Sequence, residues 1–352
     1  MTTAPNTGIQ QASPAMRFPL LISLCLLAML LLAIIHIGVG SVAIAPPDVM
    51  AALLGTPTDP LHHTIVWDLR LPRALIAVTA GAMLGLAGAI LQSITRNPLA
   101  SPALTGVLSG AVLAAVLWTV AGPNHLQGAG PIVPLIATGG GLATGALVYA
   151  LSWRGGTSPL RLVLAGVLVG AMLSSTTSLV LLIDSANMGN ILHWLIGSLN
   201  GRVWSHWYTL APFALITLPL GLASASLANA LHLGDGVAAG LGVRVEPTRA
   251  VLLLIAVLLI AGAVAIVGSI AFIGLIAPHI ARNLVGGDHR RLFPFTAVFA
   301  GSLLLMADII ARAITLLTTT SSGAGAPNLP VGAVTAMLGA LFFLYLMLRK
   351  EN

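Results

Sequence analysis

The residues of this chain that could carry out chemistry are few and widely separated. His279 follows Pro278 in an apolar stretch, and His62 and His63 stand together early in the chain. His279 has no neighbouring Cys, Asp or Glu ligand, and the His62-His63 pair is likewise a weak candidate, so we expect no metal site. The sequence has no Gly-x-x-x-x-Gly-Lys-Ser/Thr phosphate loop and no cluster of acid, base and nucleophile. We therefore predict that the chain is not an enzyme, and that His279 makes structural hydrogen bonds.

The elements that carry these residues must be membrane helices. Hydrophobic residues make up 57% of the 352 residues, charged residues make up 7%, and the mean hydropathy is +1.01. A soluble domain is roughly one quarter charged. A spanning helix takes about 20 apolar residues, so about eight to eleven spans fit. The net charge of +6 would suggest a nucleic-acid partner in a soluble protein, but the basic residues stand at the ends of apolar runs, and we expect no nucleic acid.

The pattern predicts an all-α polytopic membrane protein with ten transmembrane helices. Residues 1–17 are expected to form a disordered cytoplasmic tail, and residues 18–350 a single transmembrane domain. The first apolar run is longer than the core of a cleaved signal peptide, so an uncleaved first span is favoured. The predicted spans, of which the eighth is short and broken, lie near 18–40, 71–95, 105–121, 131–152, 160–183, 206–228, 248–268, 271–285, 291–317 and 330–348.

The distribution of basic residues orients these spans. With the N-terminus in the cytoplasm, eleven of the fifteen Lys and Arg residues fall on the cytoplasmic side. The positive-inside rule favours this arrangement, which places both termini in the cytoplasm. The outer side then receives Arg70, Arg73, Arg202 and Arg312, and these need another reason to be there.

The stretch from Gly268 to Arg282 is apolar enough for a membrane but is interrupted by Gly268, Gly274, Pro278 and His279. A broken helix in a bilayer leaves backbone groups without partners unless protein or a watery cavity surrounds them. We therefore expect this segment to be buried in the bundle, beside a pathway.

An internal repeat relates this segment to an earlier one. A shift of 176 residues places Arg73-Ala74 on Arg249-Ala250 and Pro102 on Pro278. The two copies, about 69–185 and 245–350, would cross the membrane in opposite directions. Inverted repeats with broken helices at their interface are typical of transporters.

Several motifs resemble one family across nearly the whole chain from about residue 60. The segments 69–73 (Leu-Arg-Leu-Pro-Arg), 88–92 (Gly-Ala-Ile-Leu-Gln) and 96–102 (Arg-Asn-Pro-Leu-Ala-Ser-Pro) are similar to those of the FecCD-type permeases of iron–siderophore, haem and cobalamin ABC importers. The same holds for Leu233-Gly234-Asp235, Leu241-Gly242-Val243, Pro278-His279, 307–312 (Ala-Asp-Ile-Ile-Ala-Arg) and 329–332 (Leu-Pro-Val-Gly). Asn328, where the family often has an acidic residue, Leu341, and the polar loop 318–326 depart from the pattern.

The resemblance implies the type II ABC importer permease fold in a bacterial cytoplasmic membrane. It implies four kinds of partner besides membrane lipid: a second permease, identical or paralogous, two cytoplasmic ATPase subunits, and a periplasmic or lipid-anchored binding protein. It also implies no cofactor in this chain, because ATP and magnesium are bound by the ATPase subunits. Transport would proceed by alternating access.

The family's functional positions carry over to three groups of residues. Exposed cations can steer an acidic partner, and the resemblance assigns docking of the binding protein to Arg70, Arg73 and Arg312. Interfacial snorkelling is the alternative, and Arg312 could simply pair with Asp308. ATPase coupling falls on the loop 229–247, with Leu233, Gly234, Asp235, Ala238, Leu241 and Gly242. The pathway would narrow at Asn97 and Leu99, although Asn97-Pro98-Leu99 also reads as a helix stop.

The segment 196–204 resembles the siderophore branch of the family more than the cobalamin branch, which implies a ferric siderophore as cargo, with haem or cobalamin as alternatives. An ion-coupled secondary carrier would bury a functional acid in the middle of the membrane. Only Asp184 and Asp308 come close, and both stand toward the ends of predicted spans.

Overall fold

The computed structural model describes residues 14–57, 59–122, 132–183, 194–322 and 328–349. In this part of the chain the regular secondary structure is helical, apart from one isolated bridge between Trp153 and Thr157. The helices, with a π-helical turn η1 and a 3₁₀ turn η2, are α1 Pro14–Gly38, α2 Pro46–Leu53, α3 Pro60–Thr64, η1 Ile65–Arg70, α4 Leu71–Thr95, η2 Pro102–Thr105, α5 Val107–Ala121, α6 Ile132–Ser152, α7 Pro159–Ile183, α9 Trp204–Ala223, α10 Ala225–His232, α11 Asp235–Gly240, α12 Val245–Val267, α13 Ile273–Val285, α14 His289–Ser322 and α15 Val331–Arg349.

Each of the ten predicted apolar segments contains a helix, but the helices differ in reach. Among the described residues, seven are long and apolar enough to cross a membrane, or eight if α9 and α10, bent by 46°, form one span. Helices α5 and α13 have 15 and 13 residues. At 1.5 Å per residue they extend about 20–22 Å, which is less than a hydrocarbon core of about 30 Å. Breaks at their N-terminal ends account for the shortness.

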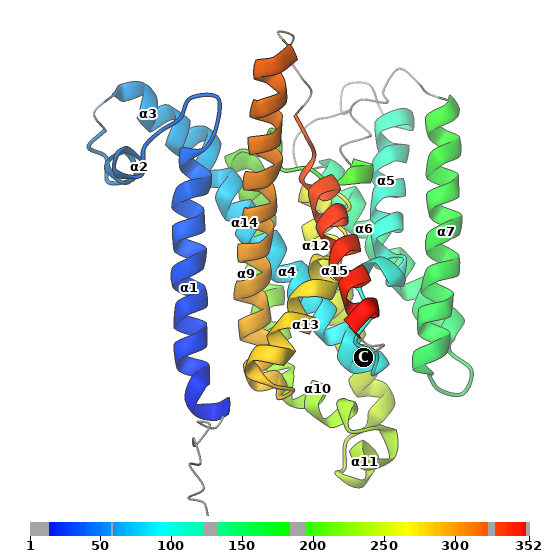
Figure 1. Ribbon diagram of the computed structural model, residues 1–352. Helices are drawn as coiled ribbons and strands as arrows, with labels where there is room; N and C mark the ends of the chain where they lie inside the picture. Colours follow the sequence, from blue (N-terminus) through cyan, green and yellow to red (C-terminus); the bar gives the residue numbers. More distant parts are fainter. Residues whose placement is uncertain (1–13, 58, 123–131, 184–193, 323–327, 350–352) are drawn as a thin grey trace, which may run out of the picture.

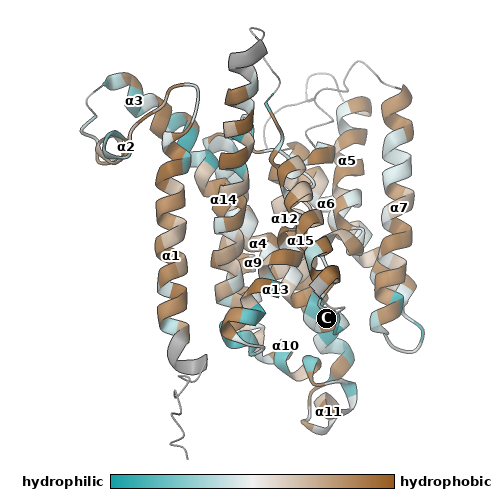
Figure 2. Cartoon of the chain, viewed as in Figure 1, coloured by the Kyte–Doolittle hydropathy of each residue, from teal (hydrophilic) through white to brown (hydrophobic). Residues whose placement is uncertain are grey.

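Helices α4 and α12, which contain the segments of the predicted internal repeat, form the centre of the bundle. Their most apolar windows are 83% and 78% buried, and the two helices pack against each other. Helices α9, α13 and α14 pack on α4, and α5, α6 and α9 pack on α12. The corresponding windows of α1, α7 and α15 are only 17%, 22% and 28% buried. Their apolar outer faces are suited to lipid or to another membrane chain (Figure 2).

The helices of the two repeats run in opposite directions. In Figure 1, α4 and α6 run toward the end of the bundle that carries α11, whereas α12 and α14 run away from it. Helices α5 and α7 are likewise opposed to α13 and α15. The start of α1 and the end of α15 lie at the α11 end. This alternation is the arrangement that an inverted repeat requires.

The interruption predicted between Gly268 and Arg282 is confined to the residues between α12 and α13. Gly268 and Phe272 both have positive φ, 72° and 67°. The backbone groups are satisfied by neighbouring segments: Ser269 N–H donates to Trp194 O (3.0 Å) and Ser198 N–H to Val267 O (2.8 Å). Gly332 N–H, at the start of α15, donates to Gly197 O (3.0 Å). Protein therefore surrounds the broken backbone, as a bilayer demands.

Gly274, Pro278 and His279 were expected to break the helix, and this expectation is wrong, because all three lie inside α13. Pro278 lacks the N–H that would bond to the carbonyl of Gly274. That carbonyl lies so close to Gly88 of α4 that a side chain at Gly88 would collide with it. The missing hydrogen bond therefore falls where α13 and α4 are in backbone contact, and the helix continues through the proline.

Candidate functional site

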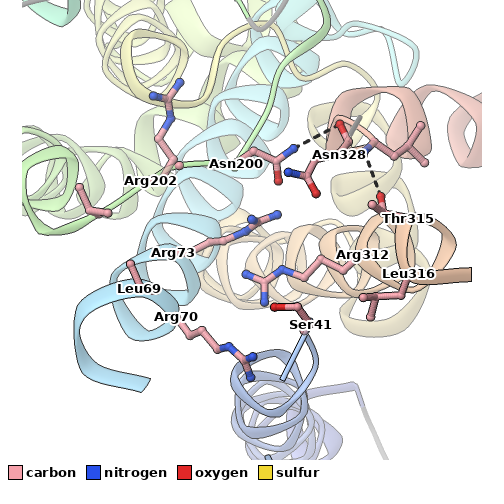
Figure 3. A pocket seen from close by; sticks show the side chains of 14 residues that line it. Ser41, Leu69, Arg70, Arg73, Asn200, Arg202, Arg312, Thr315, Leu316 and Asn328 are labelled. Carbon is pink, nitrogen blue, oxygen red and sulfur yellow. Dashed lines mark hydrogen bonds between the residues drawn. The ribbon is translucent and has the colours of Figure 1, made fainter. Parts of the chain in front are cut away.

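A polar pocket opens at the end of the bundle opposite to α11. Its volume is about 440 Å³, and it lies between the start of α4, the segment 200–203, α14 and the residues before α15. Four arginines line it: Arg70, Arg73, Arg202 and Arg312 (Figure 3). We call this the arginine pocket. The four are the same basic residues that the predicted topology leaves on the outer side.

One buried carboxylate organises the arginine pocket. Asp308 of α14 has a fully buried side chain and accepts two hydrogen bonds from Arg73, at 2.8 Å from Nε and 2.7 Å from Nη2. His36 Nε2 lies 2.7 Å from Asp308 Oδ2, and Arg312 Nε lies 3.5 Å from the same oxygen. Arg73 and Arg312 are 12% and 13% exposed. A single carboxylate thus faces two guanidinium groups and a histidine.

Arg70 does not present its charge to the solvent, contrary to the expectation of an exposed cation. The residue is 6% exposed, and its guanidinium donates to the carbonyls of Ile37 (2.7 Å), Gly38 (3.0 Å) and Val42 (2.5 Å). These carbonyls belong to the end of α1 and the connection that follows it. Arg70 therefore fastens this connection to the start of α4.

Arg202 also lines the arginine pocket. It was predicted to lie on the outer side of the membrane, but no docking role was predicted for it. Its Nη1 lies 3.1 Å from His206 Nε2, and the residue stands in the segment before α9. Burial lowers the pKa of its guanidinium to about 10, and the nearby charge of Arg73 acts in the same direction. No carboxylate of the described residues forms an ion pair with Arg202.

The other end of the bundle carries the projecting helix α11 (Figure 1). Leu233, Val237 and Leu241 are 60%, 53% and 64% exposed, whereas Ala238 is buried beneath them. Gly234 and Gly242, on either side of α11, have φ of 104° and 80°, which glycine adopts without strain. Exposed apolar side chains beyond the membrane helices are typical of a protein interface.

Asp235, predicted to touch the ATPase, is used inside the chain. Its Oδ1 accepts from Arg249 Nη2 at 2.8 Å and lies 3.3 Å from Arg96 Nη2. Arg249 is 1% exposed and also donates to Glu246 Oε1 (2.7 Å) and to the carbonyl of Thr157 (2.7 Å). One carboxylate therefore joins α11 to the end of α4 and the start of α12.

The turn after α4 holds Asn97 and Leu99. Arg96 caps the helix with φ 50°, and Asn97 Oδ1 accepts from Leu99 N–H at 2.9 Å. The Asn97 side chain thus closes a turn around Pro98, as the interpretation as a helix stop predicts. Leu99 is 44% exposed, at the same end of the bundle as α11.

A second polar network connects α10 with α4 and was missed from the sequence. His289, buried at the start of α14, contacts Ser93 Oγ with Nε2 and Asn229 Oδ1 with Nδ1 (2.6 Å). Asn229 donates to Asp288 Oδ1 at 2.8 Å. This hydrogen bond is the main cause of the lowered pKa of Asp288, and the N–H of Arg290 adds to it.

Comparison with known proteins now decides the family. The profile of the FecCD transport family matches residues 26–349. The chain belongs to the FecCD transport family. It is 37% identical to the Fe(3+)-citrate import system permease protein YfmD of Bacillus subtilis, covering 84% of this chain and 87% of that one. It is 38% identical to the Fe(3+) dicitrate transport system permease protein FecD of Escherichia coli, covering 82% and 87%.

The fold agrees with the family. A solved chain of an ABC transporter assigned to the metal-chelate type, in an inward-facing conformation, superimposes with a TM-score of 0.81 at 30% identity, covering 94% of this chain and 99% of that one. This FecCD protein is therefore a multi-pass permease subunit of an ABC importer. It is not itself catalytic, and ATP is bound by a partner ATPase chain.

The remaining residues singled out from the sequence have structural surroundings that differ from those expected. The ring of His279 packs edge-on against Phe342 with centroids 5.7 Å apart, in place of the expected hydrogen bond. The described residues contain no group of three or more His, Cys, Asp or Glu side chains able to hold a metal ion. Asp184 lies outside the described residues. Arg249 was considered in the sequence only as the counterpart of Arg73 in the predicted repeat. In the structure it pairs with both Asp235 and Glu246.

Proposed function

We propose that this permease carries a ferric chelate, most specifically a ferric siderophore, across a bacterial cytoplasmic membrane. The observation that carries the proposal is the agreement among its relatives. Besides the two citrate permeases, a hydroxamate permease and an achromobactin permease are 35% and 36% identical to this chain. Haem and cobalamin permeases are the alternatives from the same family.

Uptake by the intact importer in a strain that lacks its own ferric-chelate permeases tests the cargo. Cells would receive radiolabelled iron as a hydroxamate siderophore or as ferric citrate, or labelled haem or cobalamin. We expect iron to accumulate from a siderophore, and radioactive gallium to accumulate from the same siderophore loaded with gallium, because gallium cannot be released by reduction and enters only with the intact chelate. Accumulation of haem or cobalamin alone would contradict the proposal.

The proposed mechanism is alternating access between two permease chains. In this proposal the ten apolar segments are ten spans, with α5 and α13 completed by the irregular segments that precede them, and the halves about 69–185 and 245–350 form an inverted repeat. The N-terminus and C-terminus lie in the cytoplasm with α11. The second permease is a paralogue, since the Fe(3+)-citrate import system of B. subtilis has two permease proteins among the relatives, YfmD and YfmE.

Docking of the binding protein is proposed at the arginine pocket. Arg73, Arg202 and Arg312 supply positive charge around a hollow of about 440 Å³, whereas Arg70 holds the wall in place. An acidic side chain of a binding protein would be attracted there. Arg73 is a poor choice for a charge-reversal test, because its loss would leave Asp308 buried without its main partner.

ATPase coupling is proposed at α11, through the exposed Leu233 and Leu241 and the backbone at Gly234 and Gly242. Ala238 supports this surface from beneath. Leu241→Asp places a charge in the apolar surface and should abolish copurification of the ATPase while the permease still folds. The pathway would narrow at Asn97 and Leu99, where α4 ends.

A further inference from the structure

Asp235 connects the projecting helix to both core helices. It is the first residue of α11 and receives Arg249 from α12 and Arg96 from the end of α4 on the same carboxylate oxygen. Helices α4 and α12 are the two most deeply buried candidate spans. Asp235 therefore links α11 to one end of each core helix.

Arg249 gives this connection a rigid base. Its Nη1 donates to the carbonyl of Thr157 (2.7 Å), to Thr157 Oγ1 (3.1 Å) and to Glu246 Oε1 (2.7 Å). Glu246 Oε2 in turn accepts from the N–H and the hydroxyl of Thr157, at 3.0 and 2.7 Å. A guanidinium that is 1% exposed must keep its partners, because an unpaired buried charge is costly. Asp235 is thus held on one side by a group that cannot easily move away.

Arg96, the other partner of Asp235, is held less rigidly than Arg249. It is 37% exposed, adopts a left-handed conformation with φ 50°, and immediately precedes Asn97. A Cβ atom at Gly234, the residue before Asp235, would lie 3.4 Å from Arg96 Nη1. The connection between α10 and α11 and the turn after α4 are therefore in contact, so a shift of α11 displaces the residues that lead to Leu99.

We propose that Arg96, Asp235 and Arg249 form a clamp through which movement of α11 repositions the Asn97–Leu99 turn against a fixed α12. We call these three residues the α11 clamp. Arg96 and Asp235 are positioning residues and touch neither cargo nor nucleotide. The inference rests on the proposed docking of the ATPase at α11, and it adds the route by which that docking reaches the pathway.

A double-mutant cycle on the complete importer tests the clamp. Arg96→Gln, Asp235→Asn and the double variant would be assembled with the ATPase and the binding protein in proteoliposomes, and cargo uptake and ATP hydrolysis would be measured together. We expect each single variant to lower uptake per ATP hydrolysed by about fivefold, the lower end for linked sites. The double variant should be no worse than either single variant. Additive losses, or unchanged ratios in both single variants, would overturn the clamp.

Two controls separate the clamp from general damage. Arg154→Gln removes an exposed arginine of the α6–α7 connection and should leave uptake per ATP unchanged. Arg96→Lys keeps the positive charge and should recover most of the coupling. If Arg154→Gln reduced the ratio as much as Arg96→Gln does, the effect would reflect lost charge at this surface and the clamp would be rejected.

The docking proposal fails separately. If Leu241→Asp leaves the ATPase bound, then α11 is not the docking element and the proposed function of this loop is wrong. If Leu241→Asp releases the ATPase but Arg96→Gln and Asp235→Asn preserve coupling, docking stands and the clamp alone is rejected.

Discussion

The two ends of this bundle are built around corresponding arginines. Arg73 stands near the start of α4 and Arg249 near the start of α12, and the repeat places them 176 residues apart. Each binds an aspartate from another element, Asp308 in the arginine pocket and Asp235 in the α11 clamp. The same chemical pairing therefore occurs at opposite ends of two antiparallel core helices.

The two aspartates differ in burial and in the length of the helix to which each belongs. Asp308 is fully buried in the 34-residue α14 and is shared with His36 and Arg312. Asp235 is 44% exposed and belongs to the six-residue α11. Burial makes the Asp308 pairing a fixed part of the core, whereas Asp235 stands on a short, glycine-flanked helix and is confined on its Arg249 side more than on its Arg96 side. If the binding protein docks at the arginine pocket and the ATPase at α11, as proposed, the first site would be rigid and the second would move.

Breaking the outer pairing should have the largest effect. Asp308→Asn leaves Arg73 and Arg312 without their carboxylate in a buried site, and we expect a loss of about 3–5 kcal/mol in the free energy of unfolding. Denaturant unfolding of the permease in detergent measures it. Asp68→Asn, at an exposed position in η1, is the matched control and should change stability little. A loss no larger than that of the control would show that the outer cluster is not a core element.

Removing the buried base of the inner network should cost less. Arg249→Met leaves Glu246 and Asp235, which are 33% and 44% exposed and can be hydrated. We expect a loss of about 1–3 kcal/mol, mainly from the unsatisfied Thr157 carbonyl. The same unfolding experiment measures it. A loss larger than that of Asp308→Asn would reverse the proposed order of rigidity.

Charge reversal in the arginine pocket should affect docking without affecting folding. Arg202→Glu changes a pocket arginine that forms no ion pair with the described carboxylates and, unlike Arg70, does not fasten the connection after α1. It places a negative charge where an acidic partner is expected. Binding-protein affinity for the assembled importer should fall by about tenfold, or about 1.4 kcal/mol. Arg154→Glu, at the opposite end, should leave this affinity unchanged. Equal binding by both variants would remove docking from the pocket.

The smallest stability effect is expected at Asp235. Asp235→Asn breaks the ion pairs with Arg96 and Arg249 at a carboxylate that is 44% exposed, and Arg249 keeps Glu246 as a partner, so the free energy of unfolding should fall by less than about 1 kcal/mol. The same variant should still lose coupling, because its role is to connect elements that move. A stability loss close to that of Asp308→Asn would mean that both clusters are structural.

The helices could be predicted from the sequence because a membrane helix is a long run of apolar residues. Each apolar run contains a helix. The motifs 69–73, 96–102 and 329–332 lie at helix ends or turns, whereas 88–92, 278–279 and 307–312 lie inside α4, α13 and α14. Family membership was also predicted, and the profile match confirms it. The position of the break was wrong, because Pro278 follows a close α4–α13 contact that no local pattern reveals.

The charge networks were only partly predictable. The possible pairing of Arg312 with Asp308, four residues apart, could be read from helical spacing. The bonds from Arg73 and His36 to Asp308 span 235 and 272 residues, and hydrophobic periodicity carries no information about such partners. Arg70 was mistaken for an exposed cation for the same reason, since its three acceptors are backbone carbonyls of a distant connection.

The hydrogen bonds around the interrupted backbone between α12 and α13 offer a way to measure motion by hydrogen exchange. The amides of Ser198, Ser269 and Gly332 donate to carbonyls of Val267, Trp194 and Gly197, each in a different segment from its donor. None of these is a hydrogen bond within one helix. If the segment 194–198 separates from the end of α12 and the start of α15 during transport, these protons lose their acceptors together and become open to exchange with solvent deuterium. Their exchange rates would then follow the opening of the pathway residue by residue, with no label attached to the protein.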